Sequence, residues 1–225
     1  MNISIFKAIG PIMIGPSSSH TAGAARLSRI ARLIVEKPFH QVSFGLHGSF
    51  AKTYRGHGTD YALVAGALGL YENDERLANS FALAKQAGIG YDFYETELDG
   101  MHENTVKMTF YLEDGSSSEI IGSSIGGGQI VITSINGFAT EFTAQTTTLI
   151  IRQRDEFGVV SKVTSVLADY GINIGIMKVS RTGKGGTAFC IIETDNRIPD
   201  DVVARLKEIK QVIAVQVINI LEQGE

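Results

Sequence analysis

The order of strand-like and helical segments over the last third of the chain limits its possible folds more than any other feature of the sequence. Four segments are short, apolar and interpreted as strands: 147–153, 173–180, 187–193 and 212–221. Two segments between them, 158–170 and 200–209, place apolar residues at the 3.6-residue spacing of a helix. The predicted order is therefore strand, helix, strand, strand, helix, strand.

This order is that of the split βαβ unit of ferredoxin-like folds, so we predict a βαββαβ domain over residues 147–225. A glycine-rich turn over 181–186 joins the two middle strands. Cys190 alternates with Ala188 and Ile192 in the third strand, which indicates a small core residue and not a nucleophile.

The earlier part of the chain mixes helices and strands. A helical stripe of apolar residues covers 21–37, and we expect Ser19 to cap this helix and Pro38 to end it. Further helices are predicted over 59–70 and 74–87. Strands are predicted from alternation and from hairpin turns over four segments: 41–47, 106–112, 117–122 and 129–135.

Two glycine-rich or irregular stretches complete this assignment. Gly126, Gly127 and Gly128 precede a strand and lack the lysine of a phosphate loop, so they indicate a bulge or a tight turn. Residues 138–145 show no clear period, and we place a domain boundary there. The predicted fold class is α+β, with an N-terminal α/β domain over 1–140 and the βαββαβ domain over 147–225.

Composition excludes several classes of protein. Of 225 residues, 44% are hydrophobic and 20% are charged, which is too apolar for a disordered chain. A net charge of −4 does not suit a surface that tracks nucleic-acid phosphates, and no apolar run is long enough to cross a membrane. The segment MNISIFKAIG lacks the pattern of a secretory signal, and one cysteine permits no internal disulfide. We expect a cytoplasmic protein without nucleic-acid or membrane partners.

Three of the five histidines lie in settings that indicate chemistry. His20 follows Ser17, Ser18 and Ser19 at the start of a predicted helix, where backbone N–H groups attract a carboxylate or phosphate. An imidazole there can move a proton near pH 7. An ordinary serine cap beside an unrelated histidine explains the pattern equally well.

The other two histidines carry weaker signals. His57 lies between two glycines before the helix that begins near Thr59, and such glycines let a ligand approach the backbone or simply form a turn. His102 precedes a strand, and Asn104, two residues later, is expected on the same face. His40 and His47 are interpreted as structural.

Three motifs together resemble a known family. GPSSSHTAGAARLSRIARLI at 15–34, FAKTYRGHGTDYALVAGALG at 50–69 and MHENTV at 101–106 are similar to the beta subunit of iron–sulfur-dependent L-serine dehydratases. Residues 148–221 resemble an ACT domain, the amino-acid-binding module that such subunits carry. The resemblance therefore covers essentially the whole chain.

The resemblance implies an activity that needs a second chain. The family splits L-serine into pyruvate and ammonia without pyridoxal phosphate. A [4Fe-4S] cluster in the alpha part acts as a Lewis acid on the substrate hydroxyl while a base removes the Cα proton. One cysteine cannot ligate such a cluster, so a cysteine-bearing alpha subunit must hold it and this chain alone is expected to be inactive.

The resemblance also assigns roles to residues. Ser17, Ser18 and Ser19 with the helix start are expected to hold the substrate carboxylate, together with Thr21 and Thr59. Either His20 or His57 transfers the proton while the other donates or accepts a hydrogen bond. His102 and Asn104 match the family's His-Pro-Asn-Thr motif, in which Glu103 here replaces the proline. No metal ligand is expected in this chain.

In the ACT-like part, Asp155-Glu156-Phe157-Gly158 corresponds to a turn that usually reads Asp-x-Pro-Gly. Phe157 here replaces the proline, a departure that leaves open a domain that dimerises without binding a ligand. The resemblance implies an amino-acid effector, for which serine is the natural candidate, bound by Asp155, Gly158 and Asn173. It also implies a homodimer through side-by-side ACT domains. Two alternatives to a catalytic subunit stay open, a regulatory amino-acid-sensing subunit and a structural scaffold for the alpha subunit.

Overall fold

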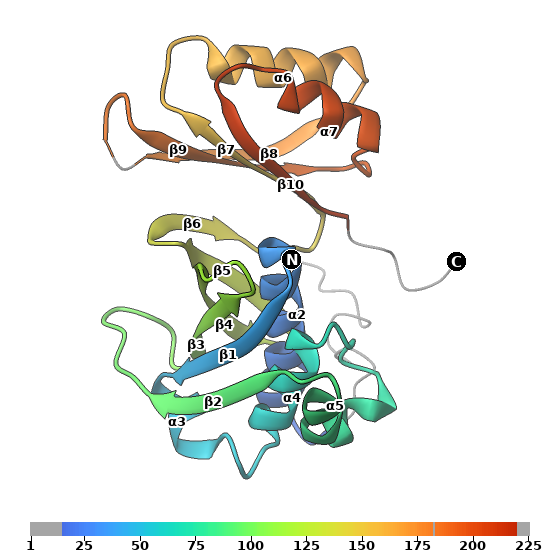
Figure 1. The fold of residues 1–225 in the computed structure, drawn as a ribbon, viewed down its shortest axis with the longest axis vertical. Coiled ribbons are helices and arrows are strands. Elements are labelled where there is room, and N and C mark those ends of the chain that lie inside the picture. The colour runs from blue at the N-terminus through green and yellow to red at the C-terminus, as the bar shows by residue number, and fades with distance from the viewer. Residues whose placement is uncertain (1–14, 182, 220–225) are drawn as a thin grey trace, which may run out of the picture. The chain divides into compact units, whose positions relative to one another are not determined.

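The computed structural model describes residues 15–181 and 183–219, and the chain divides into two compact units between Gly137 and Phe138 (Figure 1). Its mixed α and β content confirms the predicted fold class. Parts of two predicted segments lie outside the described residues: Thr182 of the glycine-rich turn, and 220–221 of the last strand. Among the described helices, none is long and apolar enough to span a membrane.

The first unit combines one sheet with helices that pack on it. A π-helical turn, Ser18–Ala22, leads directly into α2 (Gly23–Val35). The remaining helical elements are α3 (Gly48–Thr53), α4 (Thr59–Ala67), a 3₁₀ turn (Glu75–Asn79) and α5 (Ser80–Gln86). The strands are β1 (Phe39–Leu46), β2 (Gly90–Glu95), β3 (Thr105–Leu112), β4 (Ser117–Gly126) and β5 (Gln129–Ile135).

The sheet of this unit has the order β2-β1-β3-β4-β5, and only β1 and β2 run parallel. The predicted periods hold in both kinds of element. Val106, Met108 and Phe110 alternate into the core from β3, while Leu27 and Ile30 face it from α2. Helix α2 packs on β3, β4 and β5, and the π-helical turn before it also contacts β4.

Helices α2 and α4 run parallel and pack unusually close together. Near their starts, Thr21 Oγ1 donates a hydrogen bond to the carbonyl of His57, just ahead of α4. Further along, a Cβ added to Gly66 would contact the backbone of Ala25 and Arg29. The contacts follow the same order in both helices, so the two N-termini lie side by side and only glycine fits at position 66.

The structure corrects several element predictions. The first helix begins with a π-helical turn at Ser18 and not at Thr21, and it ends at Val35, before Lys37. The helix predicted over 59–70 ends at Ala67, and the one predicted over 74–87 is a 3₁₀ turn followed by a short α-helix. Strand β2 and helix α3 were not predicted, because a hydrophobic period is a weak signal over an element of only six residues.

Gly126, Gly127 and Gly128 have positive φ angles and form a tight turn between β4 and β5. A tight turn is one of the two predicted alternatives, the other being a bulge. Residues 138–142, where the sequence shows no period, form strand β6 (Phe138–Phe142), the first element of the second unit. Strand β6 lies against β8 and β9, with Phe138 packed on Phe189 at 4.4 Å between ring centroids.

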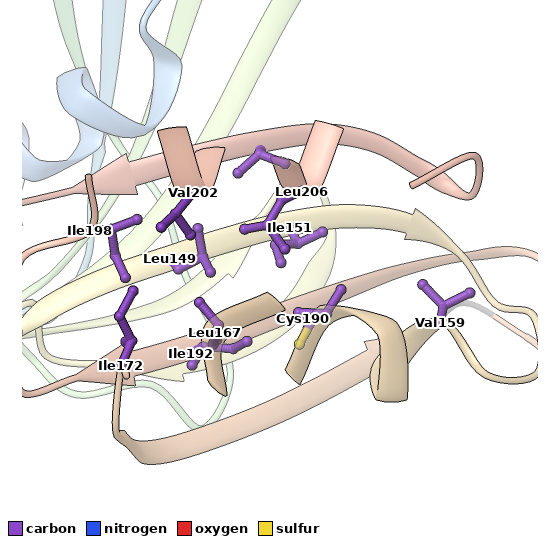
Figure 2. Packing of buried hydrophobic residues seen from close by; sticks show 12 residues of the cluster. Leu149, Ile151, Val159, Leu167, Ile172, Cys190, Ile192, Ile198, Val202 and Leu206 are labelled. Atoms are coloured by element: carbon purple, nitrogen blue, oxygen red, sulfur yellow. The ribbon is translucent and has the colours of Figure 1, made fainter. Parts of the chain in front are cut away.

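The second unit has the predicted βαββαβ order. Its elements are β7 (Thr147–Arg154), α6 (Val159–Asp169), β8 (Ile174–Arg181), β9 (Thr187–Thr194), α7 (Asp200–Lys207) and β10 (Val212–Ile218). The strands take the order β10-β7-β9-β8, and both helices lie on one face (Figure 1). Leu149, Leu167 and Val202 join Cys190 in one buried cluster, so this cysteine is a core residue as predicted (Figure 2).

A methyl group at position 66 should separate α2 from α4. We expect Gly66→Ala to destabilise the chain by about 3 kcal/mol, because overpacking against backbone leaves no side chain that can move aside. The measurement is urea unfolding of the whole chain. Gly90→Ala is the matched control, since its added Cβ meets Gln41 at an ordinary 3.5 Å. Equal stability of the two variants would contradict the close contact.

Candidate active site

The π-helical turn shapes the first motif. Ser17 caps it, because its hydroxyl accepts a hydrogen bond from the His20 N–H at 3.1 Å. The Ser17 carbonyl accepts from both Thr21 N and Ala22 N, at 2.9 Å and 3.2 Å. The expectation that Ser19 is the cap is therefore wrong, since the wider turn moves the cap two residues earlier and frees the Ser19 hydroxyl. Such π-helical insertions occur frequently at functional sites.

The imidazole of His20 is held on both sides. Its Nδ1 is hydrogen-bonded to Ser19 Oγ at 3.0 Å and its Nε2 to Ser49 Oγ at 3.1 Å. The ring packs edge-to-face with that of Phe50, with 5.3 Å between ring centroids. The half-buried ring therefore has a defined orientation in the free chain.

The second motif joins the first at this point. The ring centroids of His20 and His57 lie 5.0 Å apart, and buried Thr21 fixes the His57 backbone through its hydroxyl. Gly58 has a φ of +66°, a left-handed turn that leaves the His57 side chain exposed before α4 begins. Thr59 follows as the first residue of that helix and is fully buried.

The third motif contacts the site through its backbone. The carbonyl of Glu103 accepts hydrogen bonds from Ser49 N at 2.7 Å and Phe50 N at 3.4 Å. Asn104 is buried beneath this contact, whereas His102 is exposed and its Nδ1 accepts a hydrogen bond from the Asn104 N–H. The predicted common face of His102 and Asn104 is wrong, because both residues precede β3 and form a turn.

Three buried polar atoms around these motifs have no hydrogen-bond partner in the described part of the chain. They are Thr59 Oγ1, Asn104 Oδ1 and Ser124 Oγ. Ser124 lies on β4 against Gly23, and its N–H donates to the carbonyl of Asn104. A buried polar atom without a partner costs about 1–3 kcal/mol. Such a group of atoms fits a site that a polar ligand or a partner chain completes.

Burial lowers the pKa of His20 below its usual value of 6.5, and the neighbouring His57 lowers it further. The carboxylate of Glu103 acts in the opposite direction. His20 is therefore neutral at pH 7 and able to accept a proton. Glu103 is the residue that replaces the proline of the His-Pro-Asn-Thr motif. This replacement places a negative charge near His20.

Ser18 and His47 both make structural contacts in this region. Ser18 contributes its carbonyl, which accepts the N–H of Gly23 inside the helical turn. His47 has the structural role expected of it, since its Nδ1 accepts a hydrogen bond from Leu98 N at 3.2 Å.

Ser49 and Ser124 were not predicted as site residues, because neither lies in a recognised motif. The GSF segment after β1, with its left-handed Gly48, is the signal that could have indicated a helix start at Ser49.

The second unit carries the other predicted site. The Asp155 carboxylate is paired with Arg181 Nη1 at 3.0 Å and accepts the Gly185 N–H at 3.2 Å, and these contacts lower its pKa. Three residues after Asp155, Gly158 has a φ of +81° and precedes the first residue of α6, Val159. Phe157 beside it is fully exposed.

Asn173 does not join this turn within one chain. It precedes β8, where its amide donates to Asp195 at 2.8 Å. Asp155 follows the far end of β7, which runs parallel to β8 because both are antiparallel to β9. Asp155 and Asn173 therefore lie at opposite ends of the sheet.

Comparison with known proteins identifies the family. Residues 4–87 match the model of the serine dehydratase beta chain, and residues 147–211 match the ACT domain. The "L-serine dehydratase, beta chain" of Peptoniphilus asaccharolyticus is 40% identical over 96% of this chain and 98% of its own length. This chain belongs to the serine dehydratase beta chain family. The resemblance that the three motifs and the ACT-like part predicted is confirmed, and with it a lyase subunit.

Two further relatives show how far the similarity extends. The "Probable L-serine dehydratase, beta chain" of Bacillus subtilis is 41% identical and covers 94% of this chain and 96% of its own. A D-3-phosphoglycerate dehydrogenase of Methanocaldococcus jannaschii is 29% identical over 64% of this chain, but over only 27% of its own length. The similarity to that dehydrogenase is therefore confined to part of a larger protein.

The residues of this beta chain do not fit an iron–sulfur cluster. Its single cysteine, Cys190, is buried between strands and helices of the ACT core, and burial raises the pKa of the thiol to about 12. Cluster ligation requires several thiolates. A cluster bound by this chain alone is therefore excluded on the chemistry of its donors.

The opposite effects of two neighbours on His20 can be tested directly. We expect Glu103→Gln to lower the pKa of His20 further, since it removes the negative charge that raises it. His57→Ala should raise the pKa toward its usual value. The measurement is an NMR titration of the His20 imidazole in the beta chain. Shifts of the same sign in both variants would contradict the described geometry.

Proposed function

We propose that the chain is the beta subunit of an enzyme that converts L-serine to pyruvate and ammonia, and that it contributes active-site residues. The observation that carries this proposal is the convergence of three motifs on His20. Residues far apart in sequence, from Ser17 to Asn104, supply hydroxyls, imidazoles and an amide to one region of the first unit. A purely structural scaffold has no need of such a group.

The N-termini of α2 and α4 suit the substrate carboxylate. Both helices direct the positive end of their dipoles toward the same region, where an anion is stabilised. The hydroxyls of Ser17, Ser19 and Thr59 add neutral donors, with Ser18 and Thr21 shaping the turn. Asn104 Oδ1, a buried acceptor without a partner among the described residues, suits the ammonium group of an amino acid.

His20 or His57 takes the proton from Cα. His20 is neutral and oriented, which favours it as the base, although its ring nitrogens are hydrogen-bonded to Ser19 and Ser49. The substrate proton therefore reaches it through one of these hydroxyls or after one of them turns aside. The exposed ring of His57, 5.0 Å away, is the alternative base or a hydrogen-bond partner. His102 of the third motif is exposed and available to a partner chain.

The cofactor belongs to a second chain in this proposal. The name of the relative in Peptoniphilus asaccharolyticus, a beta chain, implies a companion chain there. We propose that a cysteine-bearing alpha subunit holds a [4Fe-4S] cluster and completes the site in the cytoplasm. The single buried cysteine of this chain agrees with such a division of roles.

The ACT domain suggests a regulatory role in the same enzyme. Strand β8 is an edge strand with Ile176 56% exposed and Val179 44% exposed, so its free edge can pair with that of a second copy. In antiparallel pairing, Asn173 of one copy comes to the end of the sheet that carries Asp155 and Gly158 of the other. We propose that a homodimer formed in this way binds serine as an effector between the copies.

Reconstitution tests the catalytic role. Pyruvate release from L-serine is measured anaerobically for this chain, for its cysteine-bearing partner with a reconstituted cluster, and for both together. We expect activity only in the mixture, and His20→Ala should lower kcat by about 10²–10⁴-fold with assembly intact, as expected for a general base. His40→Ala is the matched control, because His40 is exposed on β1 outside the site.

Full activity of the partner alone would exclude the catalytic role and leave the regulatory subunit as the function of this chain. If the mixture stays active in both His20→Ala and His57→Ala, the remaining function is that of a structural scaffold for the alpha subunit. Each result is read together with a size measurement of the assembled complex, so that loss of assembly is not mistaken for loss of chemistry.

The regulatory role has its own test. We expect Asn173→Ala and Asp155→Ala each to weaken L-serine binding to the full chain by about tenfold, as the loss of a hydrogen bond to a charged group does. Calorimetric titration of the dimer measures this change. Asn73→Ala, at an exposed turn of the first unit, is the control. Tight binding to a chain that stays monomeric would contradict a site shared between copies.

A further inference from the structure

The strongest unassigned feature of the site is Ser49, which no motif includes and which lies 29 positions from His20 in sequence. Its hydroxyl is hydrogen-bonded to His20 Nε2 at 3.1 Å, while the neighbouring Ser19 binds Nδ1 at 3.0 Å. An imidazole bound at both nitrogens cannot rotate without losing a hydrogen bond. Ser19 is adjacent to His20 in sequence, so the hydrogen bond from Ser49 is the one that depends on the tertiary fold.

Ser49 is itself held firmly by the third motif. Its N–H donates to the Glu103 carbonyl at 2.7 Å, and the next N–H, from Phe50, donates to the same oxygen at 3.4 Å. One turn later, Thr53 Oγ1 donates to the Ser49 carbonyl at 2.7 Å. The start of α3 is therefore fixed by the turn that precedes β3.

Gly48 makes this close approach possible. It has a φ of +58°, and a Cβ added there would lie 2.6 Å from the Glu103 carbonyl oxygen. A side chain at this position would displace the turn and move Ser49 away from His20. Phe50, the fully buried residue that follows Ser49, packs its ring edge-to-face with the imidazole. Helix α3 thus supplies both a polar and an apolar contact to one ring.

A hydroxyl is well suited to this position. It can donate to a bare nitrogen or accept from a protonated one, so the bond to Nε2 persists in both protonation states of the ring. A carboxylate in the same place would favour the charged imidazolium, whereas His20 has a lowered pKa and stays neutral. Serine holds the ring without adding charge.

We propose that Ser49 is a positioning residue for His20, and that the third motif acts on the site through the Glu103 carbonyl, which holds Ser49 in place. The proposal rests on the function proposed above for His20. It differs from that function in concerning the orientation of the ring, which is measurable in this chain alone.

The first test uses the chain without its partner. Imidazole ¹⁵N NMR reports which nitrogen of His20 carries the proton and how fast that proton exchanges with water. We expect Ser49→Ala to shift the Nε2 signal and to speed exchange, and Ser49→Thr, which keeps a hydroxyl, to resemble the original chain. Ser117→Ala is the control, because Ser117 is exposed at the start of β4. An unchanged His20 spectrum in folded Ser49→Ala would overturn the proposal.

The second test uses the assembled enzyme. We expect Ser49→Ala to lower kcat by about ten- to a hundredfold with KM changed less than about twofold, as expected when a base is misplaced and substrate binding is kept. Ser49→Thr should restore most of kcat. If the NMR spectrum changes while kcat does not, the orientation by Ser49 stands and the proposed role of His20 in catalysis fails. If Ser49→Ala fails to fold, Ser49→Cys, which keeps the volume but donates weakly, replaces it in both measurements.

Discussion

The first unit depends on the close packing of two parallel helices. Gly66 of α4 lies against the backbone of α2 at Ala25 and Arg29, and no larger residue fits there. This contact aligns the two helix starts, so that the SSSHT turn and the GHGT turn meet. Thr21 then joins them with a hydrogen bond to the His57 carbonyl. The site is thus a consequence of how closely two backbones approach each other.

The polar groups of the site are arranged around that junction in two layers. One layer, with Ser17, Ser19 and His20, comes from the π-helical turn itself. The other comes from the sheet side, where the turn before β3 holds α3 by hydrogen bonds to the Glu103 carbonyl. Thr59 Oγ1 in the second motif and Asn104 Oδ1 in the third motif are buried and have no hydrogen-bond partner among the described residues. Unsatisfied buried atoms are costly for folding, which indicates that they are kept for a ligand or a partner.

Sequence reasoning succeeded where a long period or a specific motif was present. The stripe of α2, the alternation of β3 and the βαββαβ order of the second unit were all predicted from apolar spacing. It failed for the shortest elements, since β2, β6 and α3 have only six, five and six residues. It also failed for the cap, because a sequence pattern does not distinguish an α-helical from a π-helical first turn.

The sequence by itself determined the family and the fold class, and it singled out the histidines and serines of the three motifs as candidates for the chemistry, because these inferences depend on residue identity and local spacing. Its one cysteine also determined that this chain cannot hold a cluster. Only the tertiary structure decided which groups meet. The partner of His20 at Nε2 is Ser49, a residue 29 positions away in a helix without a motif, and the separation of Asp155 from Asn173 follows from strand direction. Contacts of this kind arise from sheet order and helix packing, which no local pattern of residues records.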